Sequence, residues 1–420
     1  MELFLSEHKK LWRRAGTKIS VFVCFLYLVV FGSILSFQWF NFGSKVDFTS
    51  SDFGRNFNGY AAIRDRQEYA LSFGGDLTDG SLQQIVQDYQ QMEAADSKRA
   101  WDLTDWAILN DWLRNLWPEL HEPGSYQVAI SYFEPEKLTD FYGRRQQVLE
   151  KYLENNNQTG KEKEYLLQID ERVSKPFYYG WIQGWQNLLS KTIDLSAKSM
   201  ALFLAIVLST LFAGEWHDNT SLLVLTTKNG RKKIAFAKIV TGLVFTVELF
   251  AMVAICGIVS QLFFMGTTGW DMPVQMIKLT AIAPMNMVQA EIYEWAFTLL
   301  GMAGYAGIVM LISSAVKSNV LALILSLAVV YVPTVIEPYL PGVLLKTLSF
   351  IPLVGSGTDI FRTYTFHIFG KYIWSPYLMI IVPVLVGIAC MLLAVREWAG
   401  KVKPRGNGRK QVKGIHDVKG

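Results

Sequence analysis

Charged residues and cysteines are scarce in this sequence. Only 18% of its 420 residues are charged, against about 25% in a typical soluble protein, and the mean hydropathy is +0.22. This composition is too apolar for a disordered chain, a nucleic-acid-binding tail or a typical soluble enzyme. The three cysteines, Cys24, Cys256 and Cys390, all lie in apolar runs, so no water-exposed part has a disulfide framework available.

Motifs of catalysis are also missing. The Gly-Lys pairs that start at Gly160, Gly370 and Gly400 are followed by Glu, Tyr and Val, which excludes the phosphate-binding pattern GxxxxGK followed by Ser or Thr. The five histidines are scattered, with neither HExxH nor a Cys/His spacing typical of zinc sites. We therefore predict that the chain itself is not an enzyme, has no ATPase site and binds no metal or cofactor.

The apolar residues are instead concentrated in six stretches, each long enough to cross a bilayer as about 20 residues of helix. These stretches are residues 19–37, 195–213, 234–264, 295–316, 318–336 and 376–395. The first is longer than the core of a signal peptide and no cleavage pattern follows it, so we expect a lasting transmembrane helix at 19–38. The sequence predicts an all-α membrane protein with six transmembrane helices.

Basic residues near the ends of these stretches predict the topology. They precede the first stretch, occupy residues 228–238, include Lys317 in the turn before the fifth stretch, and recur after residue 396. Six alternating spans put all of them on one face, and Lys and Arg are retained on the cytoplasmic side. We expect a plasma-membrane protein with both termini in the cytoplasm, an amphipathic helix at 1–18 and a basic tail at 397–420.

The same alternation places residues 39–192 outside the cytoplasm. Helical spacing of apolar residues starts at Thr78 or Asp79, recurs between Trp106 and Trp117, and returns after Pro135. This pattern predicts a separately packed helical domain, in which tryptophans at helical spacing are expected in the core rather than on a ligand surface.

Residues 193–396 are expected to hold the other five spans. Prolines interrupt apolar stretches in residues 338–375, which predicts a re-entrant segment of short helices there. Gly301, Gly304 and Gly307 give the fourth span a small-residue face, which favours close helix packing over a substrate groove. Tryptophans near the outer span ends are predicted interface anchors: Trp39, Trp270, Trp295 and Trp374.

One carboxylate falls inside a span. Glu248 lies about 15 Å beyond Lys238 along the third predicted helix, where a charged side chain costs about 2.5 kcal/mol or more. Two interpretations remain open. Glu248 belongs to a translocation path and binds a cationic substrate or a proton, or it is protonated or hydrogen-bonded and ties its span to Thr241, Thr246 or another helix.

The stretch 211–240 combines a carboxylate, a polar turn, leucines, threonines and basic residues in a fixed order. The residues concerned are Glu215, Asn219, Thr220, Leu222, Leu223, Leu225, Thr226, Thr227, Gly230, Arg231 and Lys238. This order resembles the coupling turn of the type-2 ATP-binding-cassette (ABC) permease family, between its second and third spans. Asn219 stands where the family usually has Gly, and residues 228–230 replace a more common Pro-containing turn. The resemblance covers nearly all the membrane part but not the external domain.

The resemblance implies the membrane subunit of an ABC exporter. Its implied partners are a second permease copy or a related permease chain, the lipid membrane, and cytoplasmic ABC ATPase subunits that bind ATP and Mg and dock on a coupling helix at 215–230. The implied substrate is a peptide, an antibiotic or another amphipathic compound. The alternative is a non-transporting sensor or scaffold whose external domain binds a ligand. Nucleic acid is not an expected partner.

The residues themselves allow two interpretations of this stretch. A short helix from Thr220 to Thr227, capped by Asn219 or Thr220 and parallel to the membrane, would present Leu222, Leu223 and Leu225 to a groove on a soluble partner. Alternatively, residues 214–238 form a solvated basic loop that obeys the positive-inside tendency.

Overall fold

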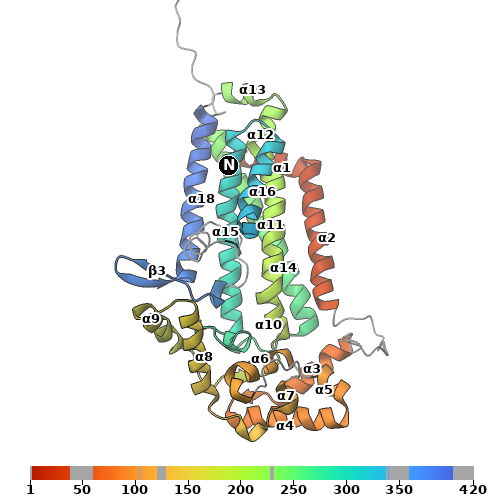
Figure 1. Cartoon of the computed structure of the whole chain (residues 1–420). Helices are drawn as coiled ribbons and strands as arrows, with labels where there is room; N and C mark the ends of the chain where they lie inside the picture. Colours follow the sequence, from red (N-terminus) through yellow and green to blue (C-terminus); the bar gives the residue numbers. More distant parts are fainter. Residues whose placement is uncertain are drawn as a thin grey trace, which may run out of the picture.

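The helices form one bundle, with a second helical region at one of its ends (Figure 1). The computed structural model describes residues 2–37, 60–103, 106–120, 129–227, 231–336, 339 and 359–400. Within these residues the chain is mostly helical, and its strands form two small antiparallel sheets of two strands each. The predicted helical class is therefore confirmed in its main part, and the two small sheets are an addition to it.

Long apolar helices make up the bundle. They are α2 (Ala15–Phe37), α11 (Ile193–Leu208), α12 (Thr210–His217), α14 (Lys232–Met265), α15 (Met287–Ala315), α16 (Asn319–Ile336) and α18 (Ser375–Gly400). Helix α11 continues the short α10 (Gln183–Asn187) and a π-helical turn, η3 (Leu188–Thr192). Two short helices lie at the other end of the bundle, α1 (Glu2–Arg13) and α13 (Ser221–Thr226).

Four helical segments are long and apolar enough to cross a membrane: Gln183–His217, Lys232–Met265, Met287–Ala315 and Ser375–Gly400. They correspond to the predicted second, third, fourth and sixth spans. The first and fifth predicted spans coincide, among the described residues, with the shorter apolar helices Ala15–Val30 and Asn319–Pro333. The count of six spans therefore stays a prediction, supported by length and apolarity at four positions.

The helical domain lies at the end of the bundle opposite α13 (Figure 1). Its helices are α3 (Tyr60–Ser72), α4 (Asp79–Ala95), α5 (Ser97–Leu103), α6 (Trp106–Leu116), α7 (Ala129–Tyr132), α8 (Phe141–Asn155) and α9 (Lys161–Asp170), with the short turns η1 (Pro118–Leu120) and η2 (Pro135–Lys137). Strand β1 (Gly75–Asp76) pairs with β2 (Tyr178–Tyr179) and brings the two ends of the domain together.

The cap of α4, the end of α6 and the tryptophans of the domain core lie where the sequence predicts them. Thr78 caps α4, because its hydroxyl accepts a hydrogen bond from the Ser81 amide while the Ser81 hydroxyl accepts one from the Thr78 amide. Helix α6 ends before Pro118, which lacks the amide proton that a helix interior needs. The predicted core position of the tryptophans is confirmed for those whose side chains are described: Trp112, Trp117, Trp181 and Trp185.

A buried arginine joins the helical domain to the loop between α14 and α15. Arg145 on α8 forms two hydrogen bonds, of 2.9 and 2.6 Å, with the carboxylate of Asp170 on α9. Its guanidinium also donates to the backbone oxygens of Leu279 and Ala281, each at 3.0 Å, in the loop that includes η4 (Val274–Met276). The domain therefore contacts the bundle through a buried guanidinium that makes four hydrogen bonds.

The predicted re-entrant segment differs from the structure where it can be compared. Residues 337–338 and 340–358 lie outside the described residues, and residues 359–374 form the turn η6 (Asp359–Phe361) and a hairpin of β3 (Thr365–Ile368) and β4 (Lys371–Trp374). Phe369 and Gly370 both have positive φ, 50° and 78°, as a two-residue hairpin turn with the right-handed strand twist requires. Short helices are therefore the wrong prediction for 365–374.

Two of the four predicted interface tryptophans are core residues instead. Trp270 is 54% exposed, as an anchor would be, but Trp295 and Trp374 are only 6% and 0% exposed. Trp295 packs between helices and Trp374 ends the hairpin with its indole nitrogen bonded to the Arg362 carbonyl at 2.7 Å. Trp39 lies outside the described residues.

Two glycines of the predicted small-residue face allow α15 and α18 to pack closely. A Cβ at Gly304 would lie 2.6 Å from the carbonyl oxygen of Pro383, and one at Gly307 would lie 2.8 Å from that of Gly387. A Cβ at Gly301 would have no atom within 4 Å. The small-residue face is thus used for helix packing within this chain at two of its three glycines.

Substitution of these glycines by alanine is expected to change stability with opposite signs. Gly304→Ala forces the backbones of α15 and α18 apart and should lower the free energy of unfolding by about 1–3 kcal/mol. Gly301→Ala meets no neighbour and should raise it by up to about 1 kcal/mol, since alanine favours the helix. Thermal unfolding of both variants in the same detergent measures this, and equal shifts would contradict the packing.

Candidate coupling site

Helix α13 crosses the end of the bundle that lies opposite the helical domain (Figure 1). It occupies Ser221–Thr226, inside the range in which a short helix was expected. The chain enters it through Asn219, whose φ of 55° lies in the left-handed region. Asparagine adopts this conformation more readily than most side chains other than glycine. This explains why Asn can occupy a position at which the resembling family usually has Gly.

Glu215 connects the end of α12 to the start of α13. Its Oε2 accepts a hydrogen bond of 2.6 Å from the Thr220 hydroxyl, and its backbone oxygen accepts one of 3.0 Å from the Thr220 amide. The Thr220 side chain makes no capping bond within α13. It fixes the position of α13 relative to α12 instead.

Glu215 also forms a buried ion pair with Lys238 of α14. Their Oε1 and Nζ atoms are 2.8 Å apart, and the two side chains are only 2% and 1% exposed. Lys238 Nζ has two further acceptors, the carboxylate of Glu7 at 2.8 Å and the backbone oxygen of Leu211 at 3.0 Å. An ammonium group has three protons, so each has an acceptor, as a buried charge requires.

Helix α1 takes part in the same arrangement. Glu7 contacts Lys238, and Lys10 Nζ lies 2.6 Å from Glu215 Oε1. Five side chains from α1, α12, α14 and the start of α13 therefore form one connected set, which we name the coupling network: Glu7, Lys10, Glu215, Thr220 and Lys238. The structure thus brings together three residues of the sequence pattern, and adds two from the predicted amphipathic helix.

The leucines of α13 do not share one face. Leu222 and Leu223 are 63% and 72% exposed, whereas Leu225 is 1% exposed and belongs to the core. The prediction that all three leucines face outward is wrong for Leu225, which packs into the core of the bundle. Leu222 and Leu223 remain as the exposed leucines of α13.

The remaining residues of the pattern close the turn. The hydroxyls of Thr226 and Thr227 donate to the backbone oxygens of Leu223 and Val224, at 2.9 and 2.8 Å. Arg231 is exposed and precedes α14. Gly230 lies outside the described residues, with its neighbours 228 and 229.

The second span contains a break in its helix close to the network. Ser209 separates α11 from α12, and Ser313 of α15 fills the break. The Ser313 hydroxyl accepts from the Phe212 and Ala213 amides at 3.0 and 3.1 Å, and donates to the Ser209 oxygen at 2.6 Å. A side chain inserted into the backbone ladder is a common cause of a helix kink. The junction of α11 and α12 is thus bridged by a side chain of α15.

Glu248 of α14 is held by α1. Its Oε1 is 3.2 Å from His8 Nε2, and its Oε2 accepts a hydrogen bond of 3.0 Å from Trp12 Nε1. These contacts agree with the interpretation in which the carboxyl ties its helix to another helix. The translocation role for Glu248 stays a prediction that the geometry does not test.

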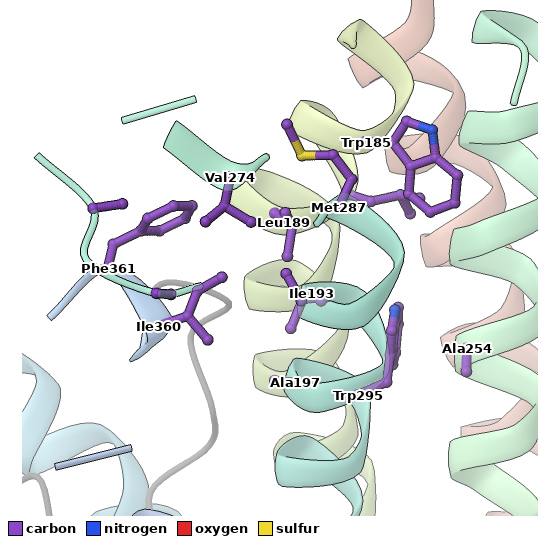
Figure 2. Close-up of a cluster of buried hydrophobic side chains, with 14 of the residues drawn as sticks. Trp185, Leu189, Ile193, Ala197, Ala254, Val274, Met287, Trp295, Ile360 and Phe361 are labelled. Atoms are coloured by element: carbon purple, nitrogen blue, oxygen red, sulfur yellow. The ribbon is translucent and has the colours of Figure 1, made fainter. Parts of the chain in front are cut away.

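Two buried carboxyls were not anticipated from the sequence, Glu291 and Glu294 on α15, which are 5% and 0% exposed. Trp295 Nε1 donates to Glu291 at 2.9 Å, and the Ile360 amide donates to Glu294 at 3.0 Å. Trp295 and Ile360 belong to the apolar cluster shown in Figure 2. The sequence does show a pair of glutamates soon after Asn286, the residue that caps α15. The predicted fourth span starts at residue 295, however, and therefore leaves both glutamates outside it.

Fold and site together define a polytopic helical membrane protein with a buried charge network at one end. The family described as ABC-2 family transporter protein matches residues 60–366, which is more than half of the chain. The chain therefore belongs to the ABC-2 transporter family, and the resemblance to type-2 ABC permeases is confirmed. The match also spans the helical domain, so the expectation that the resemblance stops at the membrane part is wrong. Neither a curated protein nor a solved structure matches it in the corresponding comparisons.

Proposed function

We propose that this chain is the membrane subunit of an ABC exporter and that separate ATPase subunits dock on α13. The observation that carries the proposal is the position of two exposed leucines, Leu222 and Leu223, on a helix whose first turn is fixed to the buried network. Exposed apolar side chains of this kind suit a pocket on a soluble partner. The family, whose members work with ABC ATPases, supports the same role.

Through the coupling network, such a partner can move the membrane helices α12 and α14. A displacement of α13 moves Thr220, which pulls on Glu215 of α12 through the 2.6 Å hydrogen bond. Glu215 in turn is bound to Lys238 of α14, so α12 and α14 move together. The break at Ser209 allows α12 to tilt without distorting α11. Movement of the ATPases would in this way alternate the pathway between two states.

The remaining features belong to the same proposal. With α13 and the basic residues in the cytoplasm, the helical domain lies outside, at the exit of the pathway. A second copy or a related permease completes the pathway, and a domain of this size suits a peptide, an antibiotic or another amphipathic substrate. With ATPases docked on α13 in the cytoplasm, six alternating spans place both termini in the cytoplasm as well.

Replacement of both exposed leucines is expected to remove the ATPase. In the full-length tagged chain expressed in its own host, Leu222→Asp with Leu223→Asp should abolish co-purification of the ABC ATPase, identified by mass spectrometry, because two carboxylates would enter an apolar pocket. Tyr178→Asp is the matched control, an exposed side chain on the helical domain, and should retain it.

Two outcomes would contradict the proposal. If the double variant keeps the ATPase and its stimulated ATP hydrolysis, α13 is not the docking helix. If the unchanged chain brings down no ABC ATPase under any condition that preserves its fold, the sensor or scaffold role replaces the exporter role.

A further inference from the structure

A cavity lies where the helical domain meets the end of α14. Its volume is about 370 Å³, and it is lined by Ile63, Arg64, Gln67, Glu68, Leu71, Phe263, Phe264 and Gly266. The α3 residues among these follow helical spacing and therefore share one face of that helix. Small-molecule pockets of proteins are about 300–1,000 Å³, so the cavity has room for a ligand group rather than only for water.

The wall formed by α3 is fixed in place. Ile63 is buried with Trp181 and Met265 in a small apolar cluster, and Gln67 donates a 3.0 Å hydrogen bond to the Thr268 hydroxyl. Trp181 and Trp185 donate their indole protons to the backbone oxygens of Met265 and Thr268, at 2.7 and 3.0 Å. The cavity is therefore a built feature of the junction.

An apolar stripe leads along α14 to this cavity. Ile255, Val259 and Phe263 are 61%, 56% and 74% exposed, and their spacing of four residues keeps them within about 80° of one another around the helix. In a membrane protein such a face contacts lipid chains. The stripe ends at the cavity, and Trp270, 54% exposed, lies just beyond it, as is usual for tryptophan at the level of the headgroups.

The rim of the cavity carries one charge of each sign. Arg64 Nε lies 2.8 Å from Glu68 Oε1, and the two side chains are 70% and 64% exposed. A phosphate is attracted by the guanidinium, and an ammonium group is attracted by the carboxylate. A headgroup with both charges satisfies both residues, whereas a headgroup with one net charge is repelled by one of them.

We propose that this cavity binds the headgroup of a zwitterionic phospholipid, with the phosphate on Arg64 and the ammonium on Glu68. The acyl chain lies on the stripe from Phe263 toward Ile255. The headgroup displaces the exposed ion pair between the two side chains, which is weak by itself. The binding site is independent of ATPase docking, because it lies at the opposite end of the bundle from α13.

The test uses full-length protein in bilayers of phosphatidylethanolamine and phosphatidylglycerol. A photoactivatable phosphatidylethanolamine probe should label residues 60–72 and 259–266, as mapped by mass spectrometry. Unlabelled phosphatidylethanolamine should compete about tenfold better than phosphatidylglycerol, the effect expected from one hydrogen bond to a charged group. The experiment needs no ATPase, so failure of the proposed transport function would not affect it.

Charge variants decide whether the headgroup is recognised. Glu68→Lys should make phosphatidylglycerol the better competitor, and Arg64→Glu should abolish labelling of these residues. Glu134→Lys is the matched control, since Glu134 forms an exposed ion pair with Lys137 at 2.8 Å elsewhere on the domain, and should leave labelling unchanged. Labelling spread evenly over α2 and α14, or equal competition by the two lipids in the unchanged protein, would overturn the proposal.

Discussion

Lys238→Met is expected to lower the free energy of unfolding by about 3–5 kcal/mol, the range found when one partner of a buried ion pair is removed. The methionine side chain has a similar length but leaves the buried carboxylate of Glu215 with the exposed Lys10 as its one remaining cation in the network. The Leu211 oxygen also loses its donor. Thermal and denaturant unfolding of the purified chain in detergent, followed by tryptophan fluorescence, measures the change.

Two further variants show whether the loss of stability comes from the unpaired buried charge or from removal of any lysine. Lys233→Met removes an exposed lysine from the first turn of the same helix and should change stability by less than about 0.5 kcal/mol. Lys238→Met combined with Glu215→Gln removes both buried charges while the amide oxygen still accepts from Thr220, and should recover part of the loss. A double variant as unstable as the single one would show that the ion pair is not the source.

The coupling network also shows what the sequence could and could not predict. Glu215, Thr220 and Lys238 lie within 24 residues of one another, and their order in the chain was enough to single them out. Glu7 and Lys10 are more than 200 residues away from their partners. Nothing in their local pattern distinguishes them from other charges on the polar face of an amphipathic helix. Only the packing of α1 against α14 selects them.

In the fold, too, features set by local sequence were predictable and features set by packing were not. Caps and spacings are local signals, so the start of α4 and the end of α6 were predictable from Thr78 and Pro118. The start predicted near Pro135 is wrong for α8, because Pro135 begins the separate turn η2 and α8 begins at Phe141, capped by Asp140. The hairpin at 365–374 depends on a positive φ at Phe369, a residue that rarely adopts it, and was therefore missed. Burial of Trp295 and Trp374 was missed for another reason: closeness to a span end indicates depth in the membrane but not which face meets protein.

Arg145→Met is the second substitution expected to have a large effect, again about 3–5 kcal/mol. Asp170, whose side chain is 6% exposed, would keep a buried negative charge with neither of its two guanidinium hydrogen bonds. The backbone oxygen of Leu279 would lose its arginine donor as well, and that of Ala281 would keep only the Gln275 amide. The loop that carries them joins α14 to α15, so hydrogen exchange of residues 266–286 should rise together with the loss of thermal stability.

The matched control for Arg145 comes from the same two helices. Lys163 of α9 pairs with Glu150 and Glu154 of α8, at 3.1 and 2.8 Å, but these carboxylates are 38% and 57% exposed. Solvent screens such pairs, so Lys163→Met should cost no more than about 1 kcal/mol and leave exchange in residues 266–286 unchanged. If both variants lose equal stability, burial of the Arg145 ion pair is not what holds the domain to the loop. A large effect of Arg145→Met alone would identify this ion pair as the attachment of the helical domain to the membrane bundle, because it is bonded to both parts.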